Sequence, residues 1–114
     1  MSEELTIENI LNKYELTIDK LPPDIVGPVL TKDEIAFAVI EAIAADNPSN
    51  FIGVIDRGSY IRVVGERKLI LNKDTLERVA GEEIRFPGEI EVRMSAFAGK
   101  IEVRGDHIMW YLER

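Results

Sequence analysis

The sequence contains no cysteine and only one histidine, His107, among its 114 residues. The absence of cysteine excludes disulfides, a thiolate nucleophile, and zinc or iron–sulfur centres held by cysteine. A single histidine likewise excludes a metal site built from several imidazoles. The chemistry open to this chain is therefore narrow.

Long apolar runs and a basic excess are also missing. The longest apolar stretch, residues 35–45, contains Glu41 and is too short to span a bilayer. The first residues lack the basic and apolar regions of a secretory peptide, so we expect a cytoplasmic protein that does not enter membranes. The 14 basic and 21 acidic side chains give a net charge of −7, which disfavours binding to nucleic acid or anionic lipid.

The negative charge is unevenly distributed along the chain. The first fifty residues hold ten acidic and three basic side chains, whereas the remaining residues hold eleven of each. An acidic surface can simply keep a small protein soluble. The alternative is that the N-terminal half meets a basic partner. Composition alone favours solubility.

The length predicts one compact domain with an N-terminal tail. Residues 1–23 form the predicted tail, because apolar residues at loose helical spacing are followed by Pro22-Pro23, which ends a helix. The tail is either a short docked helix or a segment that is disordered until it binds. Residues 24–114 form the predicted domain.

The strongest helical pattern begins after a short apolar strand. Residues 25–30 predict that strand, with Pro28 placing it at a sheet edge because proline cannot donate to the ladder. Thr31 and Glu34 have the spacing of a capping box, and the helix is expected to run to about Asp46.

This helix carries apolar residues on two sides. The wider stripe has the spacing of a helix packed on a core. The narrower stripe contains Phe37, Ile40 and Ala44. It is either covered by the tail or by a curved sheet, or it is exposed and docks on a partner. The pattern leaves both interpretations open.

The second half of the chain predicts mainly strands and turns. The expected elements are a hairpin over 51–57 and 60–65, a strand over 68–71, a helix over 73–80, a half-exposed strand through Ile90, Val92 and Met94, a loop over 95–99, and a hairpin over 100–104 and 107–112. The prediction is an α+β fold in which two helices pack on a mostly antiparallel sheet.

Few residues in this sequence suit catalysis. No Gly-x-Ser-x-Gly elbow, phosphate-binding loop or dinucleotide fingerprint occurs. Asp106 and His107 lie in a predicted turn and are most simply a solvated pair, although an enzyme built on them is one hypothesis. A second hypothesis is a small nucleic-acid-binding domain that uses four basic residues: Arg57, Arg62, Arg67 and Lys68. The shortage of catalytic groups favours a binding or regulatory role.

Five motifs in order resemble a known family. They are Val26-Gly27-Pro28-Val29, Asp46-Asn47-Pro48, Asp56-Arg57-x-x-Tyr60-Ile61-Arg62, Leu69-Ile70-Leu71 followed by Thr75-Leu76-Glu77, and Ser95-x-Phe97-Ala98-Gly99. The resemblance covers roughly residues 25–112. The chain resembles the coupling (effector) proteins of soluble bacterial di-iron monooxygenases, which act in methane, phenol, toluene and alkene hydroxylating systems. The toluene and alkene branch is the most similar.

This resemblance implies a regulatory protein with no catalytic residues, cofactor or metal of its own. It would bind the di-iron hydroxylase component near its active site, change the di-iron geometry and gate substrate and oxygen access. Electron transfer would thereby be coupled to hydroxylation or epoxidation of a hydrocarbon. The system would also include a ferredoxin and a reductase, and the free protein would be a monomer. Nucleic-acid binding remains the alternative function.

The resemblance also implies which residues meet the hydroxylase. In the family, the connection between the two C-terminal strands faces the partner, and here it comprises Ser95, Ala96, Phe97, Ala98 and Gly99. The alternative is a plain connection with Phe97 buried in the core. The second candidate segment is the helix end at Asp46 and Asn47, which could instead be a simple helix stop. The exposed interpretation of the narrow helix stripe adds Phe37 and Ile40.

Overall fold

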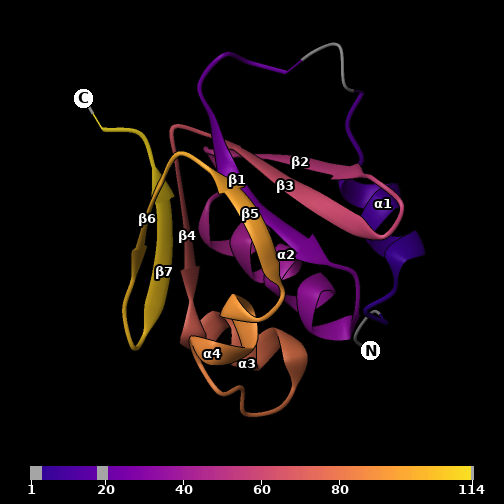
Figure 1. The fold of residues 1–114 in the computed structure, drawn as a ribbon. Helices are drawn as coiled ribbons and strands as arrows, with labels where there is room; N and C mark the ends of the chain where they lie inside the picture. The colour runs from indigo at the N-terminus through magenta and orange to yellow at the C-terminus, as the bar shows by residue number, and fades with distance from the viewer. Residues whose placement is uncertain (1–3, 18–20, 114) are drawn as a thin grey trace.

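The computed structural model describes residues 4–17 and 21–113. Figure 1 shows the arrangement of the helices and strands. In chain order they are α1 (Ile7–Tyr14), β1 (Ile25–Thr31), α2 (Glu34–Asp46), β2 (Phe51–Asp56), β3 (Tyr60–Glu66), β4 (Lys68–Asn72), α3 (Lys73–Ala80), α4 (Gly88–Glu91), β5 (Met94–Ala98), β6 (Lys100–Val103) and β7 (His107–Tyr111).

The strands form two antiparallel sheets. The order is β2-β3-β1-β5 in the first sheet and β4-β7-β6 in the second. In the view of Figure 1, α2 lies behind β1 and β5, while α3 and α4 lie together at one end of the molecule. The predicted α+β class is confirmed. The detail of two helices on one sheet is corrected, because the strands divide into two sheets and the described residues also include α1 and α4.

Helix α2 is the centre of the core. Its residues from Ala36 to Ile40 are all buried, as are Ala42 and Ile43. The helix contacts α1, α3 and β4. The narrow stripe is therefore covered within the chain, since Phe37 is 8% exposed and Ile40 is fully buried. The interpretation of these two side chains as an exposed docking stripe is wrong.

The start of α2 differs from the expected capping box. Asp33 is the N-cap, and its carboxylate accepts a hydrogen bond of 2.9 Å from the Ala36 N–H. Thr31 is instead the last residue of β1. Aspartate caps a helix as well as threonine does, and Asp33 directly precedes the helix, so local geometry favours it. The predicted end at Asp46 is confirmed.

Strand β1 lies inside the first sheet rather than at its edge. It pairs with β3 on one side and β5 on the other. The ladder with β3 passes from Val26 to Val29 without pairing Gly27 or Pro28, and Gly27 has a φ of 135°. The proline therefore falls where the β3 ladder is already interrupted, which removes the reason for an edge position.

The segment from residue 88 to 98 also departs from expectation. Instead of a strand through Ile90 and Val92, residues Gly88–Glu91 form the short helix α4, with Ile90 fully buried and Val92 79% exposed. Ile90 and Met94 share a face at either helical or strand spacing, so a few alternating residues do not distinguish the two. The expected loop is instead strand β5, which ends just before Gly99.

The N-terminal segment includes a docked helix. Thr6 caps α1, and the Glu41 carboxylate of α2 accepts hydrogen bonds from Lys13 and Tyr14. The next residues extend to the first sheet, where the Leu16 N–H donates to the Val54 carbonyl at 2.9 Å. The docked-helix interpretation therefore holds for residues 7–14. Residues 1–3 and 18–20 of the predicted tail lie outside the described part of the chain.

Candidate functional site

Strand β5 forms one edge of the first sheet and presents its side chains to solvent. Among the described residues, it pairs only with β1. Ser95, Ala96 and Phe97 are exposed, and Ala98 is half-buried. Phe97 is 44% exposed, so the interpretation that buries it in the core is wrong.

The backbone at both ends of this exposed stretch has defined geometry. Ala96 lies opposite Val29 and Met94 lies opposite Leu30, which leaves Ser95 as the extra residue of a β-bulge. At the other end Gly99 has a φ of 91°. A Cβ there would lie 2.8 Å from the Val26 Cγ1 atom, so only glycine fits this turn.

A second large apolar side chain is exposed just before β5. Val92 is 79% exposed and lies two residues before the strand. Single exposed apolar residues are common, whereas here two of them lie within one six-residue segment that leads into and along a sheet edge. We call Val92 together with residues 95–99 the β5 edge. Sequence reasoning missed Val92 because it assigned this residue to a regular strand.

The predicted helix-end residues are used by the fold. Asn47 is 7% exposed. Its side-chain NH2 group donates to the Ile43 carbonyl at 2.7 Å and to the Ile70 carbonyl at 2.8 Å. Its side-chain oxygen accepts from the Ile70 N–H at 2.9 Å. The Asp46 carboxylate accepts from Asn72 at 2.8 Å. The simple helix-stop interpretation accounts for both residues. They lie at the opposite end of α2 from Asp33, about 20 Å away along thirteen residues.

Arg93, which directly precedes β5, and Asp56, at the end of β2 on the opposite edge of the sheet, both have shifted pKa values. Burial alone would lower the pKa of Arg93, but its hydrogen bonds with Glu89 and Asp33 outweigh burial and raise it. The Lys32 ammonium and the Gly58 N–H hydrogen-bond to Asp56 and lower its pKa. Both shifts strengthen the charged form at neutral pH. These groups therefore serve as fixed charges rather than as proton donors or acceptors.

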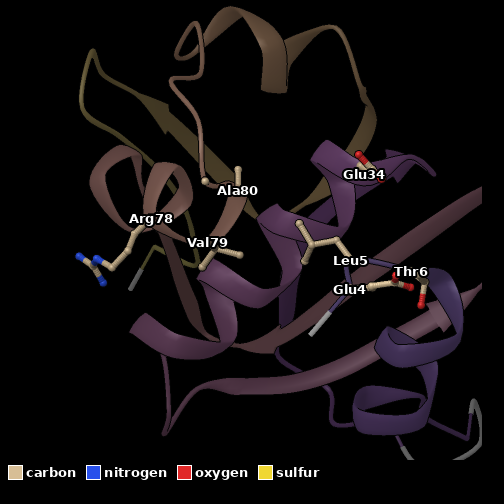
Figure 2. A pocket seen from close by; sticks show the side chains of 8 residues that line it. Glu4, Leu5, Thr6, Glu34, Arg78, Val79 and Ala80 are labelled. Atoms are coloured by element: carbon tan, nitrogen blue, oxygen red, sulfur yellow. The ribbon is translucent and has the colours of Figure 1, made fainter. Parts of the chain in front are cut away.

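One cavity has no residue of the β5 edge in its lining. Its volume is about 540 Å³, and it lies between the residues that precede α1, the first turn of α2 and the end of α3. In Figure 2 the Arg78 guanidinium points away from Leu5 and Glu34. A smaller cavity of about 200 Å³ includes Glu82 and Glu83 in its lining. No residue of the β5 edge lines either cavity.

Within residues 4–17 and 21–113, no group of three or more histidine, cysteine, aspartate or glutamate side chains could hold a metal ion. In the same ranges, no helix combines the length and apolar character needed to cross a bilayer.

The alternative centred on His107 rests on the contacts of its ring with two carboxylates. Its Nδ1 lies 2.8 Å from the Asp106 carboxylate, and its Nε2 lies 3.4 Å from the Glu102 carboxylate. The Asp106 side chain is 86% exposed, and His107 lines neither cavity described above. The geometry is that of a solvated surface pair, as the sequence most simply indicated.

The four basic residues of the nucleic-acid hypothesis do not form one patch. Arg57 lies at the β2–β3 turn, whereas Arg67 and Lys68 lie beyond the other end of β3. The seven residues of that strand separate the two groups by about 20 Å. Arg67 is also paired with Asp24 at 2.7 Å. Arg62 lies near the middle of β3, so the four residues are spread along the strand and are not gathered at one place.

This chain is similar to known proteins both in its amino-acid sequence and in its fold. The effector subunit of the alkene monooxygenase system of Xanthobacter autotrophicus (strain Py2) is 35% identical over 95 residues, which are 83% of this chain and 93% of that protein. Several solved structures share the fold, and two of them are described here. A phenol hydroxylase–regulatory protein complex contains a chain with a TM-score of 0.67 and 22% identity, covering 78% of this chain and 99% of that one.

The second solved structure is the regulatory protein B of soluble methane monooxygenase. It has a TM-score of 0.59 and 21% identity, and covers 86% of this chain and 74% of that one. A family model described as MmoB/DmpM matches residues 24–111, which is most of the chain. The chain therefore belongs to the MmoB/DmpM family.

Proposed function

We propose that this protein is the non-catalytic effector component of a bacterial multicomponent di-iron monooxygenase and that it binds the hydroxylase component. The observation that carries the proposal is the 35% identity to an effector subunit along nearly the whole length of that subunit. The relatives are named effector or regulatory proteins, which supports a role without catalysis of its own.

The β5 edge is the proposed contact with the hydroxylase, near its active site. The exposure of Phe97 and Val92 on an edge segment supports this assignment. Burying the exposed part of Phe97 in a complex would contribute about 1–2 kcal/mol of apolar transfer free energy. The proposed contact omits Phe37, Ile40 and Asn47, which are buried in the fold.

The proposed mechanism is a shift of the hydroxylase between two conformations. An effector favours a conformation only by binding it more tightly than the other. The favoured conformation would have altered di-iron geometry and gated access for substrate and oxygen, which couples electron transfer to hydroxylation or epoxidation. The effector holds no cofactor, acts in the cytoplasm with a ferredoxin and a reductase, and is a monomer when free.

The domain division is part of the same proposal. Residues 24–114 form the effector domain, and residues 1–23 form an N-terminal extension that contains α1. The family match over residues 24–111 supports the boundary, because it begins at the residue that follows Pro22-Pro23.

Replacing Phe97 tests the proposed contact. We expect Phe97→Asp to bind the hydroxylase at least tenfold more weakly and to lower product formed per electron consumed, because a carboxylate must then be desolvated at an apolar contact. Calorimetric titration and product yield measure the two effects. Tyr60→Asp is the matched control, since Tyr60 is similarly exposed, at 41%, but lies on β3. Wild-type binding and yield in folded Phe97→Asp would refute the contact.

A further inference from the structure

Arg93 connects α4 to β5, and its guanidinium bonds two carboxylates. Its Nε lies 2.8 and 3.1 Å from the two Asp33 carboxylate oxygens. Its Nη1 donates to the carboxylate and the carbonyl of Glu89, both at 2.7 Å. The side chain is only 19% exposed, so water screens these charge-assisted bonds less than it would on an open surface.

The backbone of Arg93 fixes a third element. Its carbonyl accepts hydrogen bonds from the Thr31 N–H at 2.9 Å and from the Thr31 hydroxyl at 3.4 Å. Asp33, which receives the guanidinium, also caps α2 through the Ala36 N–H. One residue therefore joins the end of β1, the N-terminus of α2 and helix α4.

This junction lies directly beside the proposed docking surface. Val92 precedes Arg93, and Phe97 follows it by four residues, about 13 Å along an extended strand. Strand β5 has a neighbouring strand on one side only, and the bulge at Ser95 interrupts that ladder. The bonds of Arg93 hold the near end of the strand, and at its far end the tight turn at Gly99 leads into β6.

We propose that Arg93 is a positioning residue for the β5 edge. Its bonds to Asp33 and Glu89 hold Val92 and Phe97 in the arrangement that the hydroxylase binds, without Arg93 itself contacting that partner. Pre-organised side chains lose less conformational freedom on binding, so affinity depends on the junction. This inference rests on the proposed function, because it specifies how the same surface is prepared.

The test compares Arg93→Gln and Arg93→Lys with Arg67→Gln in the full-length protein. Arg67 is the matched control because its guanidinium is also paired with a carboxylate, at 2.7 Å. It directly follows β3 and belongs neither to β5 nor to α4. Affinity for the hydroxylase component encoded with this chain is measured by calorimetry, and amide hydrogen exchange is followed in β5. We expect Arg93→Gln to weaken binding at least tenfold and to speed β5 exchange, with Arg67→Gln unchanged in both.

A double-variant cycle separates positioning from a general loss of stability. In the Arg93→Gln background, Phe97→Ala should weaken binding much less than it does in the wild type, whereas in the Arg67→Gln background its effect should be unchanged. Additive effects of Arg93→Gln and Phe97→Ala, or unaltered binding by Arg93→Gln, would overturn the positioning role.

Two further outcomes are also decisive. If Arg93→Gln does not fold, Arg93→Lys keeps the charge without the planar fork, and its wild-type affinity would likewise overturn the role. If the wild-type protein itself does not bind the hydroxylase, the proposed function fails, and the positioning role fails with it.

Discussion

Asn47 shows how one side chain can join two layers of the fold. It ends α2 and bonds both backbone groups of Ile70 in β4 as a neighbouring strand would. We expect Asn47→Ala to lower the free energy of unfolding by about 2–4 kcal/mol, since three hydrogen bonds are lost and buried backbone groups are left unpaired. Urea denaturation followed by the fluorescence of Trp110, the one tryptophan, measures the change.

A matched asparagine provides the control. Asn50 also donates to a carbonyl, that of Glu66 at 2.9 Å, but this bond is exposed. Asn50→Ala should therefore lower the free energy of unfolding by less than about 1 kcal/mol. Equal costs for the two variants would show that the Asn47 bonds add nothing beyond an ordinary surface contact.

The ion pair of Lys32 and Asp56 predicts a pH dependence. The hydrogen bond from Lys32 and that from the Gly58 N–H lower the pKa of Asp56 in the folded protein. The unfolded state then binds more protons as the pH falls below about 4, so the stabilisation present above that pH is lost in acid. Lys32→Met should have a lower free energy of unfolding than the wild type at pH 7. Between pH 5 and 3, its free energy of unfolding should fall less steeply than that of the wild type. An unchanged decline in urea titrations would contradict this prediction.

At the scale of elements, helix α1 depends on docking for its stability. It has only eight residues, which is too short for independent stability, and Ile10 is its one fully buried residue. We expect Ile10→Asp to undock α1, so that amides of residues 7–14 exchange faster. The urea midpoint of unfolding, followed by Trp110 fluorescence, should shift less in Ile10→Asp than in Ile40→Asp. The reason is that Ile40 lies in the central helix. Equal shifts in both variants would mean that α1 unfolds only with the whole domain.

Helix α2 and strand β5 differ in how far the sequence predicts them. The end of α2 follows from local signals, namely a long apolar pattern and Pro48 after Asp46, whereas its cap is Asp33 and not the expected Thr31. The five residues of β5 have no comparable signal, because their pairing with β1 joins segments more than sixty residues apart. The spacing of Glu89 and Arg93 could have indicated the helical turn at α4, since they form an i, i+4 ion pair.

At the scale of the whole molecule, the charge distribution predicts how the complex forms. The net charge of −7 comes entirely from the first fifty residues, whereas the β5 edge belongs to the balanced half. If the acidic half steers the encounter with a basic hydroxylase surface, raising salt should slow association more than it speeds release. Stopped-flow kinetics across salt concentrations measure both rates. Association rates that do not change with salt would leave the charge with a solubility role.

The sequence by itself determined the features that depend on neighbouring residues. Absent cysteine and a single histidine excluded most cofactor chemistry, and helix caps, turns and the motifs around Phe97 indicated the elements and the family resemblance. Tertiary structure decided which surfaces remain exposed. Phe37 and Phe97 are both aromatic residues in apolar segments, yet the first is 8% exposed and the second 44%. Burial depends on which distant segments pack together, and the spacing of apolar residues along one segment does not specify that packing.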